Sequence, residues 1–188
     1  MNKRWEILPI DEKKQILLEK NLHISSSLAE ILTRKNLDEN SAKLFLNPTK
    51  IPYHDPFLLK DMEKACQRLL LALKNKEKIC IYGDYDVDGV SSTALLMTVF
   101  TKLGFNIDYY LPDRHSEGYG LHIESLQKLI PKYDLLITVD CGITALDEVD
   151  YAKDKIDMII TDHHLPREIL PDAFAIINPT QTQCKYPN

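Results

Sequence analysis

The spacing of apolar residues changes near residue 78. Before it, apolar residues recur at helical spacing, as Ile16, Leu17 and Leu22 do. The second such segment follows a serine and the third begins at an aspartate, and both residue types cap helices. A proline-rich linker over 47–56 leads to an amphipathic fourth segment. The pattern predicts helices over residues 11–23, 25–37, 38–47 and 58–76.

After residue 78, short apolar runs alternate with longer amphipathic ones. The pattern predicts strands at 79–82, 106–112, 135–140, 157–161 and 173–178, with helices at about 91–103, 121–130 and 144–153. Such alternation is typical of an α/β fold with a mainly parallel, Rossmann-like sheet flanked by helices. The runs are apolar throughout, so we expect both faces of the sheet to be covered. The chain is thus expected to comprise a helical amino-terminal extension, 1–75, and an α/β domain, 76–188.

Acidic and imidazole side chains follow three of the predicted strands. DYDVDG comes after the first, Asp140 ends a later one, and Asp162, His163 and His164 end the next. The carboxyl ends of parallel strands share one edge, where ligands bind, so these residues are expected to converge. Asp and His together, without matching Lys or Arg, predict a metal site.

The DYDVDG segment carries three aspartates where a dinucleotide-binding loop would use glycines, and it would repel phosphate unless metal ions lay between them. In an extended segment, Asp86 and Asp88 would point to the same side, roughly 6.5 to 7 Å apart. Each is therefore expected to hold one of two ions, with Asp140 as the bridge.

The neighbouring residues have expected roles of their own. Gly89 lets a helix start close to the loop, and Ser91 or Ser92 is expected to cap that helix. Asp84 is either a partner of the helix dipole or a metal ligand. Asp162 either binds metal or orients the adjacent histidines.

Two other kinds of site share part of this pattern. An EF-hand calcium loop also opens with D-x-D-x-D-G, but it needs a preceding helix and a glutamate at its twelfth position, where this chain has Leu95. A haloacid-dehalogenase-type phosphatase would use Asp86 as its nucleophile, but that residue should directly follow the apolar strand, and here three residues separate them. That interpretation leaves Asp140 and the histidine pair without a role.

Composition narrows the class of protein. The chain has 188 residues, 44% of them apolar, and a net charge of -5. Four cysteines without a C-x-x-C pair indicate neither a zinc site nor a disulfide framework. No membrane span or secretory signal is evident, so we expect a cytoplasmic protein with no membrane partner. An acidic chain repels nucleic acid unless bound cations, a local basic groove or basic parts elsewhere compensate.

The motifs DYDVDG, VDCG and DHH, in this order, resemble the first three motifs of the DHH phosphoesterase superfamily. The segments DPFLLKDMEKA, PDRHSEGYGL and INPTQTQCKYP are similar to its single-strand-specific exonucleases. The resemblance implies an enzyme that requires Mn²⁺ or Mg²⁺, with two ions, and removes nucleotides from the 5′ end of single-stranded DNA in recombination and repair. Such a mechanism needs no protein nucleophile.

The resemblance also implies roles for individual residues. The positions that match the family's metal ligands are Asp86, Asp88, Asp140 and His163. His164 matches the histidine expected to act on the scissile phosphate. Many members have a metal-binding histidine four residues before Asp86, where this chain has Tyr82, and Asp84 is expected to substitute for it in part.

DNA contacts are expected from the segment before the predicted helix at 121–130. The candidates are Arg114, His115, Gly118, Tyr119 and Gly120; the alternative is that the glycines only form a turn. The resemblance further implies single-strand-binding protein and a helicase as partners. It likens the chain to an amino-terminal fragment, since further family domains and one more metal-binding aspartate would lie downstream, so weak or absent activity is expected of the 188 residues alone.

Two alternatives remain within the superfamily. One is a phosphodiesterase for short oligonucleotides or cyclic dinucleotides, which would not require the helices before residue 75. The other is a catalytically incomplete fragment.

Overall fold

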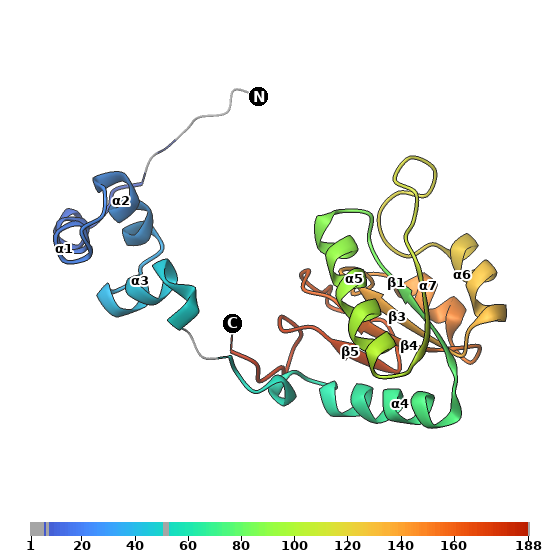
Figure 1. Cartoon of the computed structure of the whole chain (residues 1–188). Helices are drawn as coiled ribbons and strands as arrows, with labels where there is room; N and C mark the ends of the chain where they lie inside the picture. The colour runs from blue at the N-terminus through green and yellow to red at the C-terminus, as the bar shows by residue number, and fades with distance from the viewer. Residues whose placement is uncertain (1–5, 7, 51–52, 188) are drawn as a thin grey trace. The chain divides into compact units, whose positions relative to one another are not determined.

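Three short helices form the first part of the chain in the computed structural model (Figure 1), which describes residues 6, 8–50 and 53–187. These helices are α1 (Glu12–Leu22), α2 (Ser26–Arg34) and α3 (Glu39–Leu46), followed by a 3-10 turn, η1 (Pro48–Lys50). The predicted caps of α2 and α3 are confirmed, because Ser25 and Asp38 accept N–H bonds from Leu28 and Ser41. The predicted linker includes residues 51–52, which lie outside the described residues.

The core of this helical unit is small. Its fully buried side chains are Leu18, Ala29, Leu32 and Ala42. Ile16 and Leu17 are each 51% exposed, so the apolar stripe predicted for α1 was wrong in part. Leu18, which directly follows the predicted positions Ile16 and Leu17, points inward because α1 packs on α2 and α3 through that side.

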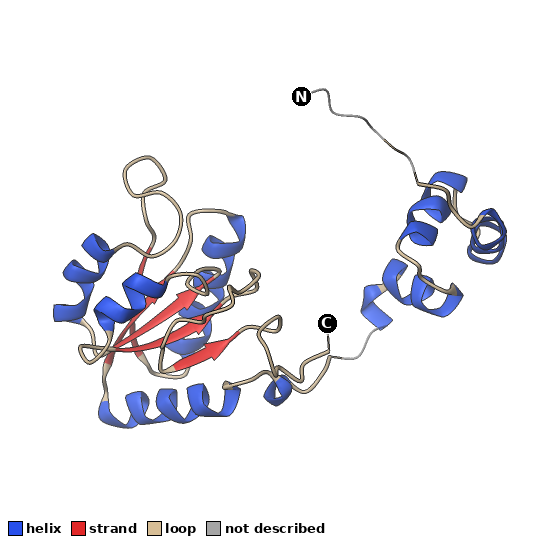
Figure 2. Ribbon diagram, turned by 180° about the vertical axis from the view of Figure 1, so that it is seen from behind, coloured by secondary structure: helices blue, strands red, loops and turns tan. Residues whose placement is uncertain are grey.

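The rest of the chain forms a five-stranded sheet with helices between its strands (Figures 1 and 2). Its strands are β1 (Lys78–Tyr82), β2 (Asn106–Tyr110), β3 (Leu135–Val139), β4 (Asp157–Thr161) and β5 (Ala175–Ile177). Its helices are η2 (Pro56–Leu58), α4 (Met62–Asn75), α5 (Val87–Lys102), α6 (Ile123–Leu129), η3 (Ile130–Lys132) and α7 (Leu146–Ala152). The order is β2-β1-β3-β4-β5, and every pairing is parallel. The predicted fold class is confirmed.

Helices cover the sheet in two layers, because alternate residues of each strand point to opposite faces. Cys80, Leu136 and Ile160 pack with α6 and α7. Ile79, Ile137 and Ile159 pack with α4 and α5 on the other face. The edge strand β2 departs from the prediction of full cover, since three of its five residues are exposed.

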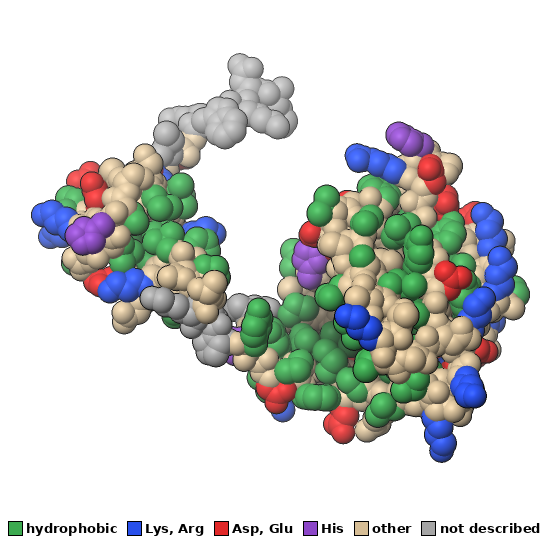
Figure 3. All heavy atoms as spheres, in the orientation of Figure 1, with side chains coloured by type: hydrophobic (Ala, Val, Ile, Leu, Met, Phe, Trp, Pro, Cys, Tyr) green, Lys and Arg blue, Asp and Glu red, His purple; other side chains and the backbone are tan. Residues whose placement is uncertain are grey.

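An apolar groove of about 400 Å³ lies between α4 and α5, lined among others by Leu69, Leu95, Phe100 and Ile137. Hydrophobic side chains gather on this face in Figure 3. None of the helices in the described part of the chain is long and apolar enough to cross a membrane.

The chain divides into compact units between Tyr53 and His54, and not after residue 75 as the sequence had suggested. Helix α4 belongs with the sheet, because Ala65 and Ala72 are buried against it. The start of α4 is also tied to β5, since the Asp61 carboxylate accepts the N–H of Ile176 at 3.1 Å.

Candidate metal centre

The sheet places three loops at one edge. Strands β2 and β3 lie on opposite sides of β1, so the chain leaves β1 in one direction and later resumes beside it in the other. A crevice forms at such a switch point, outside the carboxyl ends of the strands. The loops that follow β1, β3 and β4 meet there, and they carry the acidic and histidine residues that the sequence singled out.

The β1–α5 loop turns into helix earlier than predicted. Asp86 is the N-cap of α5, and its Oδ1 accepts the N–H groups of Asp88 and Gly89 at 2.9 and 3.0 Å. The serine caps were therefore predicted wrongly; Ser91 Oγ instead donates to the Val87 carbonyl within the helix. Asp88 sits in the first helical turn, so the extended geometry expected for Asp86 and Asp88 does not occur.

The loop is compact because Gly89 lies directly on the backbone of Asp84. A Cβ at Gly89 would come within 2.5 Å of the Asp84 nitrogen and oxygen. Real Cβ atoms do not approach backbone atoms so closely, which confirms that glycine allows the helix to start beside the loop. This close contact holds the backbone of Asp84 against the first turn of α5.

Asp84 is 1% exposed, and its Oδ1 has no hydrogen-bond partner among the described residues. Burial raises the pKa of this carboxyl, and the nearby charge of Asp86 adds to the effect. A buried carboxylate oxygen without a donor is costly. Asp84 therefore fits a position where a cation completes its environment.

Asp140 follows β3 with φ of 61°, a left-handed conformation that Asp adopts more readily than most residues. Its N–H donates to the Thr161 carbonyl at 3.0 Å, which ties it to β4. Burial raises the pKa of Asp140, as does the negative charge of Asp86. In contrast, the N–H bonds from Gly89 and Asp88 lower the pKa of Asp86.

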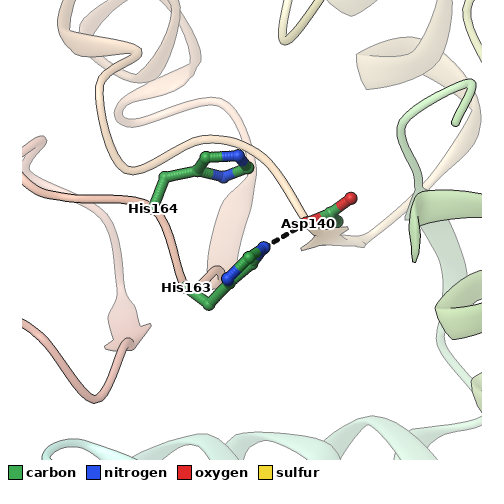
Figure 4. Close-up of side chains that lie close together, drawn as sticks. All are labelled: Asp140, His163 and His164. Atoms are coloured by element: carbon green, nitrogen blue, oxygen red, sulfur yellow. Dashed lines mark ion pairs between the residues drawn. The ribbon is translucent and has the colours of Figure 1, made fainter. Parts of the chain in front are cut away.

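Two histidines approach Asp140 from the end of β4. The His163 ring is directed at the Asp140 carboxylate, with Nε2 3.0 Å from Oδ1 (Figure 4). The His164 ring lies beside it, 4.6 Å from that of His163 between centroids. Both rings are accessible, with 63% and 45% of their side-chain surfaces exposed.

Both carboxylate oxygens of Asp162 accept hydrogen bonds from the protein itself. Oδ1 accepts the N–H groups of His163 and His164 at 2.7 and 3.1 Å, and the His164 Nδ1 lies 2.7 Å away. Oδ2 accepts the N–H of Ile143 at 3.0 Å. The bond from Asp162 raises the pKa of His164 and leaves the His164 Nε2 free to face the crevice. Of the two roles open for Asp162, this geometry favours orientation of the histidines.

The side chains gather into two groups that share one member. Asp84, Asp86 and Asp140 form one, and Asp140, His163 and His164 form the other; within each, one potential ligand atom per residue lies within 4.8 Å of the others. Two carboxylates facing each other with imidazoles nearby are suited to divalent cations. The residues present thus fit a pair of ions with Asp140 between them.

Asp88 belongs to neither group among the described residues. It lines a hollow of about 510 Å³ at the same edge, together with Ser92, Asp140 and His163. The side chain of Tyr82 is buried, and its hydroxyl donates to the Gly120 carbonyl at 3.0 Å. Asp84, and not Tyr82, therefore lies among the potential ligand atoms at this edge.

The loop after β2 reaches this edge through an aromatic side chain. The Tyr119 hydroxyl lies 3.3 Å from the His164 Nδ1, and burial raises the tyrosine pKa. The Arg114 guanidinium stacks over the ring of Tyr85, 5.3 Å from its centroid. His115 is exposed and donates its N–H to Asp113.

Gly118 and Gly120 have φ of 82° and 88°, and a Cβ at either would meet nothing within 4 Å. Conformation, and not crowding, accounts for both glycines. Glu117 ties this loop down by accepting hydroxyl bonds from Tyr110 and Ser125 at 2.5 and 2.6 Å. The sequence did not reveal this role, because the partners lie on a strand and a helix.

Comparison with known proteins agrees with the geometry. The family model described as the N-terminal domain of the DHH family matches residues 78–186. The chain belongs to the DHH family. The matched DHH segment runs from the start of β1 to the turn after β5, so it contains every residue of the two ligand groups.

Individual relatives of this DHH chain are exonucleases. It is 43% identical over 187 residues to the single-stranded-DNA-specific exonuclease RecJ of Bacillus subtilis (strain 168), covering 98% of this chain and 24% of that protein. A crystal structure of exonuclease RecJ bound to manganese is 34% identical, with a TM-score of 0.64, over 70% of this chain and 34% of the other. RecJ of Thermus thermophilus in complex with Mn²⁺ is 25% identical, with a TM-score of 0.66, over 98% and 26%. The chain thus spans only a minor part of the relatives it matches.

Proposed function

We propose that this chain is the metal-binding part of an exonuclease that hydrolyses phosphodiester bonds of single-stranded DNA from the 5′ end, in recombination and repair. The observation that carries the proposal is the pair of ligand groups joined at Asp140. The similarity to RecJ supports the choice of substrate. A phosphodiesterase for short oligonucleotides or cyclic dinucleotides is the alternative that the experiment below separates from it.

The proposed ligands divide between two sites for Mn²⁺ or Mg²⁺. Asp84 and Asp86 would hold one ion, His163 the other, and Asp140 both; Asp88 is retained as a proposed ligand facing the hollow. Bound there, the ions would supply Lewis-acid stabilisation of the charge that develops on the attacked phosphate. Imidazole among the ligands favours Mn²⁺ over Mg²⁺, which prefers oxygen.

The protein's own residues would position the reacting groups. His164 would face the crevice with its Nε2, since Asp162 holds Nδ1. Because the bond to Asp162 raises the pKa of His164 and so favours its protonated form, the ring is suited to donate a hydrogen bond from Nε2 to the scissile phosphate. Asp162 orients the ring of His164, as carboxylate partners of histidines commonly do. No side chain is required to act as a nucleophile, because water attacks the phosphorus.

The loop of residues 113–120 is the proposed DNA contact. Arg114 stands over Tyr85 of the metal-binding loop and would pair with a phosphate, while His115, Gly118, Tyr119 and Gly120 would border the path of the strand. The ions and Arg114 would offset the acidic character of the chain near DNA. We further propose a cytoplasmic location and cooperation with single-strand-binding protein and a helicase, on the family resemblance alone.

The test uses the full-length protein with Mn²⁺ and a long single strand labelled at its 5′ end. A duplex of the same sequence, a 3′-labelled strand and a dinucleotide serve as competing substrates. Early release of the 5′ label with little loss from the duplex is the expected result. Preference for the dinucleotide would transfer the protein to the short-substrate hydrolases, and no metal-dependent hydrolysis of any substrate would refute the proposal.

A further inference from the structure

The turn after β5 contains two buried side-chain amides that donate to different segments of the chain. Asn178 is 0% and Gln181 4% exposed. The Gln181 Nε2 donates to the carbonyl of Ile176 at 2.6 Å and so closes the turn on its own strand. The Asn178 Nδ2 donates to the carbonyl of His164 at 2.9 Å and so reaches across to the histidine pair.

The orientation of the Asn178 amide is determined by Thr180. The Oδ1 of Asn178 accepts the backbone N–H of Thr180 at 2.8 Å and the side-chain hydroxyl of Thr180 at 2.7 Å. The same hydroxyl lies 3.2 Å from the His164 carbonyl, but it has a single proton, and the Asn178 oxygen is nearer. The amide nitrogen of Asn178 is therefore the donor that holds His164.

The backbone of the histidine pair is held on both sides. Asp162 accepts the N–H groups of His163 and His164, and Asn178 holds the carbonyl that follows them. The His163 ring is largely exposed, and its Nε2 makes a polar contact with the carboxylate of Asp140. Its direction consequently depends on the peptide planes from which it projects.

We propose that Asn178 is a positioning residue of the metal centre: its hold on the His164 carbonyl aims the rings of His163 and His164 at Asp140. The ends of three strands are then linked at His163 and His164. Asp162 after β4 accepts their N–H groups and that of Ile143 after β3, and Asn178 after β5 donates to the His164 carbonyl. The inference rests on the proposed function, because it assumes that the histidines bind an ion. It adds a residue that touches neither ion nor substrate.

The test compares Asn178→Asp with Gln181→Glu in the full-length protein. Each substitution replaces a buried amide donor by an oxygen of similar shape, so both variants are expected to lose stability. Mn²⁺ affinity, measured by electron paramagnetic resonance, is expected to fall roughly 10- to 100-fold only in Asn178→Asp, as is usual for outer partners of metal ligands. In the metal-free protein, the imidazole resonances of His163 and His164 should shift in Asn178→Asp and not in Gln181→Glu.

Several outcomes distinguish this inference from the proposed function. Wild-type protein that does not bind Mn²⁺ would refute the proposed metal site. Normal binding by wild type with unchanged affinity in Asn178→Asp, or equal losses in both variants, would overturn the role of Asn178 alone. If far-ultraviolet circular dichroism shows Asn178→Asp to be unfolded, Asn178→Ser and Gln181→Ser replace the pair, since a serine hydroxyl is too short to reach both partners of Asn178.

Discussion

The charged side chains at the two ends of the strands differ in whether they have partners. We call these ends of the sheet its amino edge and its carboxyl edge. At the amino edge, Arg68 contacts Glu77 at 2.7 Å and Asp157 at 2.6 Å. It also donates to the Asp134 carbonyl at 3.4 Å, and the Asp134 carboxylate accepts the N–H of Lys78. Each of these four charged side chains has an opposite charge or a hydrogen-bond donor beside it.

At the carboxyl edge, negative charges face one another. Burial and the charge of Asp86 both raise the pKa of Asp140 and of Asp84. Among the described residues the ion-pair partner of Asp140 is His163, and not a Lys or Arg. Unpaired buried charge costs stability. The difference teaches that the amino edge holds the fold together, whereas the carboxyl edge is arranged for a cation from outside.

The largest effect is expected from Asp140→Asn. Loss of the shared ligand should lower Mn²⁺-dependent hydrolysis by about 10³-fold, which corresponds to several kcal/mol of transition-state stabilisation. Asn tolerates the left-handed backbone, so the fold should be retained. Without metal, the variant should melt no lower than wild type, because repulsion from Asp86 is relieved. Steady-state kinetics checks the expected loss of hydrolysis, and thermal unfolding checks the expected stability. Near-normal turnover would contradict the role of Asp140 as a ligand shared by both ions.

Arg68→Met should produce the converse result. It leaves Glu77 without its partner, and we expect a loss of about 2 to 3 kcal/mol in the free energy of unfolding. This is less than the roughly 3 to 5 kcal/mol usual for a fully buried pair, because the side chain of Asp157 is exposed. Mn²⁺ affinity should be unchanged. Lys153→Met, which breaks an exposed pair with Asp172, is the control and should have no measurable effect. A change in metal affinity with Arg68→Met would show that the edges are coupled.

Gly89→Ala should disturb both properties. Its Cβ would clash with the Asp84 backbone, so a destabilisation of about 2 kcal/mol is expected from overpacking, together with weaker Mn²⁺ binding. Gly104→Ala is the matched control, because Gly104 has φ of 84° but open space around it. The control variant should lose stability but bind Mn²⁺ as wild type does. Denaturant unfolding and metal titration of both variants decide whether contact with Asp84 matters.

The smallest effect concerns the loop that carries Tyr119. The hydroxyls of Ser125 and Tyr110 lower the pKa of Glu117, so the folded state favours its charged form. Its stabilisation is present above the ordinary glutamate pKa of about 4.3 and is lost as the pH falls through the folded value. The stability difference between wild type and Glu117→Gln should therefore shrink in acid, as measured by urea unfolding across pH. A constant difference would contradict the ionic role of Glu117.

Much of the architecture could be predicted because local patterns report it. Apolar runs of strand length marked all five strands, and Ser25 and Asp38 marked two helix starts. The start of α5 was missed because Asp86, expected only as a ligand, also caps the helix. The exposure of Ile16 and Leu17 was missed because the packing partners of a helix, and not its own periodicity, decide which side is buried.

The sequence by itself determined the alternation of strands and helices, the parallel sheet, and the residue types at the carboxyl ends of β1, β3 and β4. Only the tertiary structure decided that the Asp84 Oδ1 has no donor among the described residues, that Asp162 accepts backbone N–H groups, and that Asn178 holds His164. Asn178 and His164 are 14 positions apart, and Asp162 and its partner Ile143 are 19 apart. The lack of a donor at the Asp84 Oδ1 depends on burial. Hydrogen-bond partners and burial are properties of neighbours in space, which the order of residues along a chain does not specify.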